Sequence, residues 1–228
     1  IVFGAFLYLF SVFSAYYVIR PIRDEAGVAG GVNNLSWLFT GTLLAMVAVN
    51  TPFAALVKRL PRSRFIGIAY RFFELNLIGF LLLFQFATGE ANVWVGRAFF
   101  IWTSVFNLFV VSVFWAFMVD VFTTEQGKRL FGFIAAAATL GGILGASITA
   151  GAVQSLGVPL LLLVSAVLIE VGVQASRQLG AHTRAFEKTG DAASGEAAPI
   201  GGSAWAGLTH ALSSPYLLNI AVYMLLYS

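Results

Sequence analysis

The chain is poor in the residues that most catalytic and metal sites need. Its 228 residues include no cysteine and only two histidines, and charged residues make up 10% of the total. The absence of cysteine excludes disulfides, thiolate metal sites and cysteine nucleophiles. The histidines, His182 and His210, stand 28 positions apart and do not suggest a metal site. We therefore expect no metal, no cofactor and no enzymatic activity.

The chain has an excess of apolar residues. Hydrophobic residues make up 59% of it, phenylalanine occurs 22 times, and the mean hydropathy is +0.88. A soluble domain of this size lacks the polar surface to cover so much apolar material. Charge-free stretches cover 26–57, 98–119 and 130–169, and a helix needs about 20 apolar residues to cross a bilayer. The sequence predicts an all-α polytopic membrane protein with the lipid bilayer as its surroundings.

Hydropathy and turn residues predict six helices and a linker. The predicted helices are 1–20, 34–57, 65–86, 93–119, 131–155 and 158–176. They form an N-terminal bundle over 1–176, followed by a polar linker at 177–214 that is rich in small residues. A seventh helix is predicted to start at 215–228. Because the chain begins with Ile1 and stops at Ser228 inside an apolar run, we expect a fragment that lacks most of a C-terminal half, which would be its partner.

Lys and Arg are spread unevenly over the predicted loops. The second, fourth and sixth loops hold four, two and three of them, whereas the loops on the opposite side hold only Arg20 and Arg23. The positive-inside rule then predicts a cytoplasmic N-terminus and a cytoplasmic linker. This distribution also accounts for the pI of about 9.4 without nucleic acid as a partner.

A cluster of charges follows the first apolar run, at Arg20, Arg23, Asp24 and Glu25. One interpretation is an interfacial anchor, with Tyr16 and Tyr17 in an aromatic belt and the charges in water. The other is a substrate site, because two arginines three residues apart can grip the oxygens of a phosphate or carboxylate. Pro21 is expected to distort or end the helix and so direct these side chains inward.

The fourth predicted helix offers further polar groups. Arg97 stands near its start, at a predicted depth similar to that of Arg20, and is either an anchor or a second anion ligand. Asn107 is a candidate ligand because polar groups at mid-membrane depth face protein or water. The tryptophans of this helix offer stacking surfaces, although packing is the commoner role of such residues.

Two acidic positions lie within predicted helices. Glu74 follows Arg71 by three residues, so these two are expected to form a neutral structural pair on one helix face. Glu170 has no obvious local partner, which makes it a candidate for proton or cation coupling, unless it simply reaches water. The fifth helix repeats small residues at four-residue spacing, including Gly141 and Gly145, which predicts tight packing against another helix.

Two segments resemble a known family. Six helices and a long linker are the outline of the major facilitator superfamily. Residues 17–24, Tyr-Val-Ile-Arg-Pro-Ile-Arg-Asp, are similar to the first-helix signature of the ATP/ADP translocase family, in which a Tyr-rich turn precedes Leu-Arg-x-x-Lys-Asp. Residues 114–132, from Phe-Trp through Glu-Gln-Gly-Lys-Arg-Leu-Phe-Gly, resemble the helix 4–5 junction of that family. Arg23 stands where these exchangers have Lys. Bacterial relatives with Arg-Pro-x-Arg-Asp sequences are facilitator-type transporters, so we expect a bacterial cytoplasmic membrane protein.

The resemblance and the charges together predict a transporter. We expect alternating-access transport of a small anion, with nucleotides of the ATP/ADP type as the class that the resemblance implies. The predicted ligands are Arg20, Arg23, Asp24, Arg97, Asn107 and Tyr16. The alternative is a proton-coupled transporter of a neutral or cationic solute, with Glu170 as the proton carrier.

A gate is predicted on the cytoplasmic side. Asp120 is expected near Lys128, Arg129 and the Lys58-Arg59 pair. We hypothesise that a bridge from Asp120 to one of these bases opens and closes the entrance. The alternative is that all of these charges are solvated and serve only to set the topology.

Overall fold

The fold is known from a computed structural model that describes residues 1–29, 31–59, 62–187, 213–216 and 218–219. The described residues form helices without a strand. Most of the predicted linker and of the predicted seventh helix lie outside them.

Five long helices make up the bundle. They are α1 (Val2–Ala29), α2 (Leu35–Arg59), α3 (Arg62–Phe86), α4 (Glu90–Val121) and α5 (Thr124–Glu187), with a short 3₁₀ turn, η1 (Val32–Asn34), before α2. Within the described residues, α1, α3, α4 and α5 contain spans long and apolar enough to cross a membrane, and α2 contributes a shorter apolar stretch, Leu35–Asn50. The all-helical fold is therefore confirmed for the described residues, and the four long apolar helices are compatible with an integral membrane protein.

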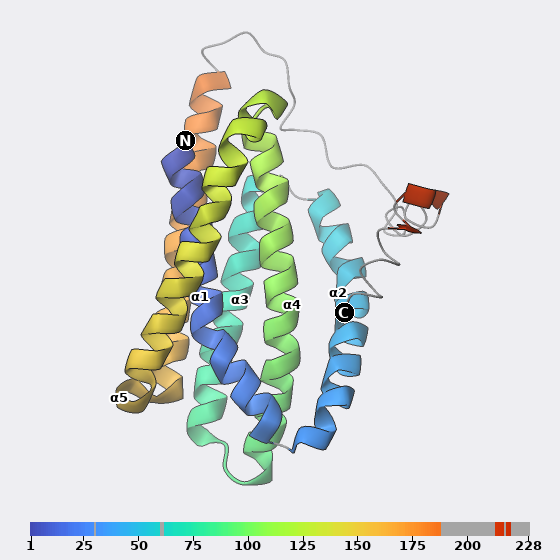
Figure 1. The fold of residues 1–228 in the computed structure, drawn as a ribbon, viewed down its shortest axis with the longest axis vertical. Helices are drawn as coiled ribbons and strands as arrows, with labels where there is room; N and C mark the ends of the chain where they lie inside the picture. The colour runs from blue at the N-terminus through green and yellow to red at the C-terminus, as the bar shows by residue number, and fades with distance from the viewer. Residues whose placement is uncertain (30, 60–61, 188–212, 217, 220–228) are drawn as a thin grey trace.

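The helix α5 is two helices joined at a glycine. Gly157 has a φ of 71° and a ψ of 171°, which is not helical, and glycine adopts a positive φ without the steric cost that other residues meet. Figure 1 shows the chain reversing at this point. We call residues 124–156 the first arm and residues 158–187 the second arm. The two arms match the predicted fifth and sixth helices, and the second continues to Glu187 rather than ending at 176.

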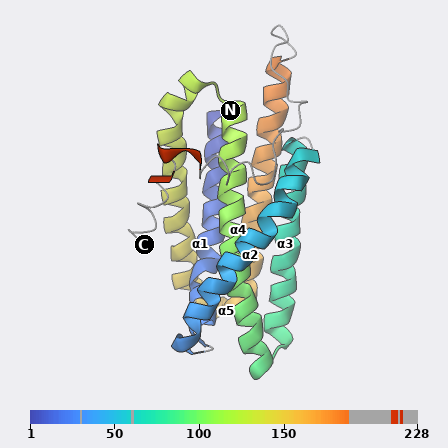
Figure 2. The same cartoon turned by 90° about the vertical axis from the view of Figure 1, so that its right-hand side faces the viewer.

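The helices run alternately up and down. In Figures 1 and 2, α1 begins where α2, α4 and the second arm end, and we call this the N-terminal end. The opposite end, the Gly157 end, holds the α1–α2 connection and the α3–α4 connection. In the sequence, the connections between helices at the Gly157 end contain no Lys or Arg. The uneven distribution of basic residues between the two ends, inferred from the predicted loops, therefore also holds for the observed connections.

The centre of the bundle is α1, which packs between the two arms of α5 and against α4. The small residues of the first arm face its backbone: a Cβ atom on Gly141 would lie 2.5 Å from the Phe10 carbonyl oxygen. Thr149 Oγ1 donates a hydrogen bond to the Val18 carbonyl at 2.9 Å. Ser165 Oγ, on the second arm, donates to the Ala15 carbonyl at 3.0 Å. The predicted tight packing of the small-residue stripe is confirmed, and α1 is its partner.

A buried polar contact joins α1, α3 and α4. The Tyr8 hydroxyl donates to the Tyr70 hydroxyl at 2.7 Å, and the Tyr70 hydroxyl donates to the Val110 carbonyl at 3.2 Å. Both tyrosines are almost fully buried, so the relay satisfies hydroxyls that would otherwise cost free energy inside the bundle. It also fixes the relative heights of three helices.

Candidate functional site

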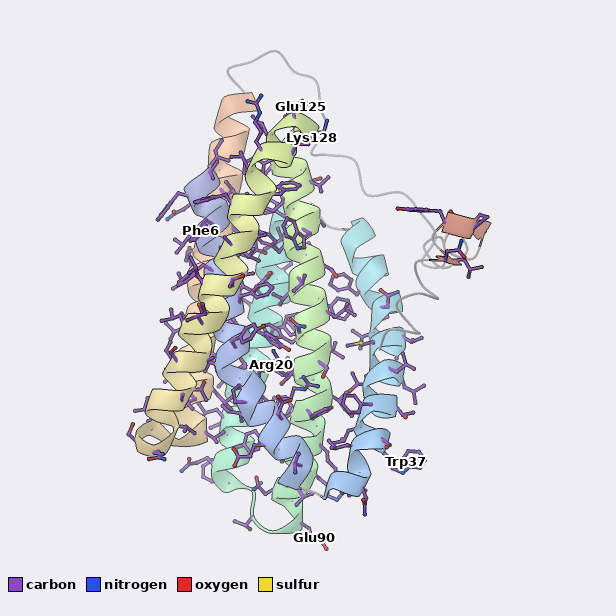
Figure 3. The ribbon with its side chains drawn as sticks, viewed as in Figure 1. Phe6, Arg20, Trp37, Glu90, Glu125 and Lys128 are labelled. Atoms are coloured by element: carbon purple, nitrogen blue, oxygen red, sulfur yellow. The ribbon has the colours of Figure 1, made fainter. Side chains whose placement is uncertain are left out.

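The charged cluster lies inside α1 and not in a loop. The helix continues through Pro21 to Ala29, so Arg20 stands nine residues before its end, which is about 13 Å along the axis at 1.5 Å per residue. Of the two effects expected of Pro21, distorting or ending the helix, the ending does not occur, and the expectation that the cluster lies in a loop is wrong. In a bilayer a broken helix leaves backbone groups without partners at a cost of several kcal/mol each, so the chain keeps the helix around the proline. In Figure 3, Arg20 lies about midway between the two ends of the bundle.

Three candidate residues share one stripe of α1. Tyr16, Arg20 and Arg23 follow one another at helical spacing, which places them on the same face. Tyr16 is 9% exposed, and both guanidinium groups are near enough to its hydroxyl to interact electrostatically. The Arg20 side chain is exposed, and its guanidinium carbon lies 5.4 Å from the Tyr17 ring centroid.

Arg23 is the charge that points into the bundle. Its guanidinium carbon lies 4.2 Å from the centroid of the Phe100 ring on α4. One of its terminal nitrogens, Nη1, is 3.7 Å from a carboxylate oxygen of Asp24, and the Arg23 side chain is 15% exposed while that of Asp24 is 56% exposed. Its Nε is buried and has no hydrogen-bond partner. The arginine thus has a stacking partner and a weak ion pair, and an N–H that remains unsatisfied.

Arg97 lies one turn before Phe100 on α4. Its guanidinium carbon stacks 4.6 Å from the Trp94 ring centroid, and its Nε is also buried without a partner. The neighbouring Gly96 packs against Ala26 of α1. Because α1 and α4 run antiparallel, the contact of Gly96 with Ala26 places Arg97 near the level of Ala26, about one turn from Arg23 and more than one turn from Arg20. The predicted match in depth between Arg97 and Arg20 is therefore wrong, and Arg23 is the closer counterpart.

Further unsatisfied polar atoms lie nearby on α4 and α2. Thr103 Oγ1 and Trp102 Nε1 are buried on α4 without hydrogen-bond partners, and Thr42 Oγ1 is buried on α2 without one. The residue before Thr42, Gly41, packs against Ile101 of α4, so this part of α2 lies next to α4. Trp102 itself packs in an aromatic cluster on the α3 side of α4, with Phe73, Phe80, Phe99 and Phe106. Asn107 follows Phe100 by seven residues, so it lies on the same face two turns deeper, and it is half-buried.

The chemistry of these orphan atoms is uniform. The N–H groups of Arg23, Arg97 and Trp102 can only donate hydrogen bonds, and the two threonine hydroxyls can also donate. Buried donors without acceptors are rare in folded proteins because each costs about 1–3 kcal/mol. The α1–α4 contact therefore holds the buried donors of Arg23 and Arg97, whereas Trp102 faces α3 and Thr42 lies on α2. We call Arg20, Arg23 and Arg97 the arginine cluster. An anion with several oxygens would satisfy it.

The predicted gate residues lie at the N-terminal end, remote from the arginine cluster. Asp120 is in the last turn of α4, and Lys128 and Arg129 are in the first turns of α5. Lys128 Nζ pairs with Glu125 Oε1 at 3.0 Å, and both residues appear at this end in Figure 3. The side chain of Arg59 lies outside the described part of the chain. A bridge between Asp120 and one of these bases stays a prediction.

Two intramembrane charges have partners that the sequence did not reveal. Arg71 Nη2 lies 3.6 Å from Glu170 Oε1, so the ion pair joins α3 to the second arm rather than Arg71 to Glu74. Gln174 donates a hydrogen bond from Nε2 to the same oxygen of Glu170. The expectation that Glu170 lacks a partner is wrong. The close ion pair of Arg71 is with Glu170, although the Arg71 charge also acts on the Glu74 carboxyl group, so the expected pairing of Arg71 with Glu74 is replaced by a group of three residues.

Sequence reasoning missed Phe100, Trp94 and Glu74 as parts of these groups. Phe100 follows Arg97 by one helical turn, so the sequence alone places this aromatic ring on the same face of the helix as an arginine. That spacing could have indicated an aromatic partner for a guanidinium group. Nothing in the sequence shows that Glu74 meets Glu170, because the two residues are on helices far apart in the chain.

No protein-family model, no curated protein and no solved structure matches this chain.

Proposed function

We propose that this protein is a secondary transporter that moves a small anion across a membrane by alternating access. The membrane-compatible helices supply the setting, and the arginine cluster supplies a binding site for negative charge. In transporters of this kind, the ligand site lies near the middle of the bilayer and opens in turn to each side. A six-helix half of the major facilitator type is the architecture we infer for residues 1–187.

The observation that carries the proposal is a pair of buried guanidinium N–H groups without acceptors. Arg23 and Arg97 lie about one turn apart in level on adjacent helices, and each has a buried Nε–H without a partner. Arginine in a membrane span is expensive and faces protein, water or a ligand. Two such groups on adjacent helices, each stacked on an aromatic ring and each with an Nε–H that lacks an acceptor, match the planar, bidentate recognition of phosphate or carboxylate.

The substrate class follows from two separate arguments. The donor set favours a multivalent anion such as a phosphate ester or a polycarboxylate. The proposal of ATP/ADP-type nucleotides as the substrate is supported only by the similarity of residues 17–24 and 114–132 to the translocase signatures. We therefore propose nucleotides as the first compounds to test within a wider class of phosphorylated and carboxylated anions.

Uptake by proteoliposomes tests this function. The full-length protein would be reconstituted and offered labelled ATP, ADP and inorganic phosphate, with and without the same compounds inside. Each charge-assisted hydrogen bond contributes about 1.5–3 kcal/mol, so Arg23→Ala and Arg97→Ala should each weaken apparent affinity by tenfold or more. Glu90→Gln, which removes an exposed charge at the start of α4, is the matched control and should transport normally. Full transport of the anion by both arginine variants would contradict the proposal.

A gate at the N-terminal end completes the transport cycle that we propose. Asp120 lies in the last turn of α4, next to the turn that begins α5. In that turn, the Gln126 N–H donates to Thr123 Oγ1 and the Thr123 N–H donates to Gln126 Oε1, a reciprocal cap that fixes the start of α5. Breaking an acid–base contact beside a rigid turn would let α4 and α5 separate at this end.

A second candidate function is proton-coupled transport of a neutral or cationic solute. The observation that favours it is the ion pair of Arg71 and Glu170, which lies within the apolar spans of α3 and α5. Uptake measured with and without an imposed pH gradient separates the two candidates. Counter-exchange of anions that does not depend on the gradient supports the first, and gradient-driven uptake of an uncharged or cationic compound supports the second.

A further inference from the structure

A carboxyl pair lies in the membrane span between α3 and the second arm of α5. Glu74 stands at the midpoint of α3, twelve residues from either end. Its carboxyl group is close enough to that of Glu170 to interact with it side chain to side chain. Both residues fall inside helical spans of membrane-crossing length. Two carboxylates in contact repel each other, and Glu74 Oε1 is buried without a hydrogen-bond partner, so one of the pair gains by holding a proton.

The neighbours of the two carboxyl groups differ. Glu170 Oε1 receives both the Arg71 guanidinium at 3.6 Å and the Gln174 amide. Glu74 Oε1 is buried and has no hydrogen-bond partner. The cation and the amide therefore stabilise Glu170 as a carboxylate, whereas Glu74 has the poorer environment for negative charge. A proton on Glu74 removes that charge and gives it a donor for Glu170.

The other groups around the pair do not supply a second strong cation. Arg177 is the remaining positive charge that acts on Glu74, and its effect is the weakest of those acting there. Arg177 lies near Gly67, about two turns closer to the N-terminal end. The residues that α1 and α4 contribute to the adjacent cavities, Leu7 and Phe117, do not titrate.

Two cavities reach this site. One, of about 760 Å³, is lined by Arg71 and Leu75 at mid-span and by Arg177 and Ala181 towards the N-terminal end. The other, of about 370 Å³, is lined by Glu170, Gln174 and Gln178. The Arg71 and Glu170 side chains are 48% and 38% exposed. Most of the lining of both cavities is apolar and Glu74 lines neither, so water meets the carboxyl pair at Glu170 and at its partners Arg71 and Gln174.

We propose that Glu74 and Glu170 form a proton-binding site, in which Glu74 holds the proton and donates it to the Glu170 carboxylate while Arg71 pairs with Glu170. Release passes the proton from Glu74 by way of the Glu170 carboxyl group to water in the smaller cavity, which Glu170 lines, and leaves two carboxylates facing each other. Their repulsion loosens the contact between α3 and the second arm, or Arg71 moves to bridge both. Proton binding itself does not depend on the proposed anion transport; only its use as a coupling step rests on that function.

Infrared spectroscopy of the full-length protein in liposomes tests the site without any solute. A protonated carboxyl group in an apolar setting has a C=O band that is lost on deprotonation and is distinct from carboxylate bands. The wild-type protein should show a band that disappears as pH is raised. Glu74→Gln should remove it, and Glu170→Gln should move its disappearance to a different pH. Glu90→Gln, which changes an exposed carboxylate, should leave it unchanged.

Variants at Arg71 give the direction of the effect. Arg71→Gln removes the cation that favours the charged carboxyl pair, so the band should persist to higher pH by about one unit or more. Arg71→Lys keeps the charge and should stay close to wild type. Should Glu74→Gln fail to fold, Glu74→Asp should retain a titrating band with an altered frequency. A wild-type protein without such a band, or a band that survives in Glu74→Gln, would overturn the proposal. If the band titrates in a protein that transports no anion, the proton-binding site is supported and only the proposed anion transport is contradicted.

Discussion

The Arg23 guanidinium carbon lies 4.2 Å from the centroid of the Phe100 ring. This contact ties the charge-bearing stripe of α1 to the start of α4, and it sets the level of the arginine cluster within the bundle. A guanidinium on an aromatic face keeps its charge available at the edges of its plane, where an anion would bind. The contact is therefore both structural and a support for the proposed site.

The Arg23–Phe100 contact should be measurable as a coupling energy. In a double-mutant cycle with Arg23→Met and Phe100→Leu, the loss of stability in the double variant should be smaller than the sum of the single losses. The difference should be about 0.5–2 kcal/mol, the range of cation–π contacts from exposed to desolvated sites. Thermal or denaturant unfolding in detergent provides the measurement. Strict additivity would show that the two side chains do not interact.

The close approach of α1 and the first arm should make Gly141 intolerant of a methyl group. A Cβ atom at this position would lie 2.5 Å from the Phe10 carbonyl oxygen and 3.1 Å from the Ser14 backbone nitrogen. Neither backbone atom can move without shifting α1, so Gly141→Ala should cost about 1–3 kcal/mol of stability. Gly151→Ala is the control, because a Cβ there meets nothing within 4 Å, and it should be neutral or slightly stabilising. Equal melting temperatures for the two variants would contradict the packing.

The tyrosine relay predicts an asymmetry between two matched substitutions. Tyr70→Phe removes the acceptor of the Tyr8 hydroxyl and leaves that buried group without its 2.7 Å partner. Tyr8→Phe leaves the Tyr70 hydroxyl still bound to the Val110 carbonyl. Tyr70→Phe should therefore be more destabilising, by about 1 kcal/mol, because an orphaned buried donor costs more than a lost pair. Thermal unfolding of both variants checks the order, and the reverse order would show that the relay runs in the other direction.

Replacing Asp120 should shift the balance between inward-open and outward-open states. If Asp120 bridges to a base at the N-terminal end, Asp120→Asn weakens that bridge and favours opening at this end. The sequence contains no cysteine, so single introduced cysteines can report accessibility to a membrane-impermeant thiol reagent on this background. Glu125→Gln, which breaks only the exposed pair with Lys128, is the control. Unchanged labelling rates in Asp120→Asn would remove Asp120 from the gate.

The sequence predicted the secondary structure more closely than the site. Five of the expected helix starts and the break at Gly157 follow from hydropathy, glycine and charge, which are properties of each segment. The end of the first helix was predicted wrongly because proline usually breaks a helix. In a bilayer, however, backbone groups need hydrogen-bond partners within the helix, and this need keeps the helix intact through Pro21. That single error moved Arg20 and Arg23 from the interior of a helix into a predicted loop.

The site was predicted in part. Arg20, Arg23 and Tyr16 do share a face of α1, which follows from their spacing. Arg97 does lie beside α1, but near the level of Ala26 and closer to Arg23 than to Arg20, because the register of two antiparallel helices depends on contacts such as Gly96 with Ala26. Neither that register nor the meeting of Glu74 with Glu170 is encoded in any one stretch of the chain.

The sequence by itself determined that this chain forms apolar helices of membrane-spanning length, with its loop charges gathered at one end. Those features depend on the free energy of moving each segment from water into the bilayer. That free energy is set by the residues of the segment itself, so it can be predicted from the sequence. Only the tertiary structure decided that Arg23 stacks on Phe100, that Arg71 pairs with Glu170, and that α1 lies between the two arms of α5. Such pairings depend on the rotation and height of one helix against another. Those are set by close packing across the whole bundle, where small residues, buried hydroxyls and aromatic rings must all fit at once.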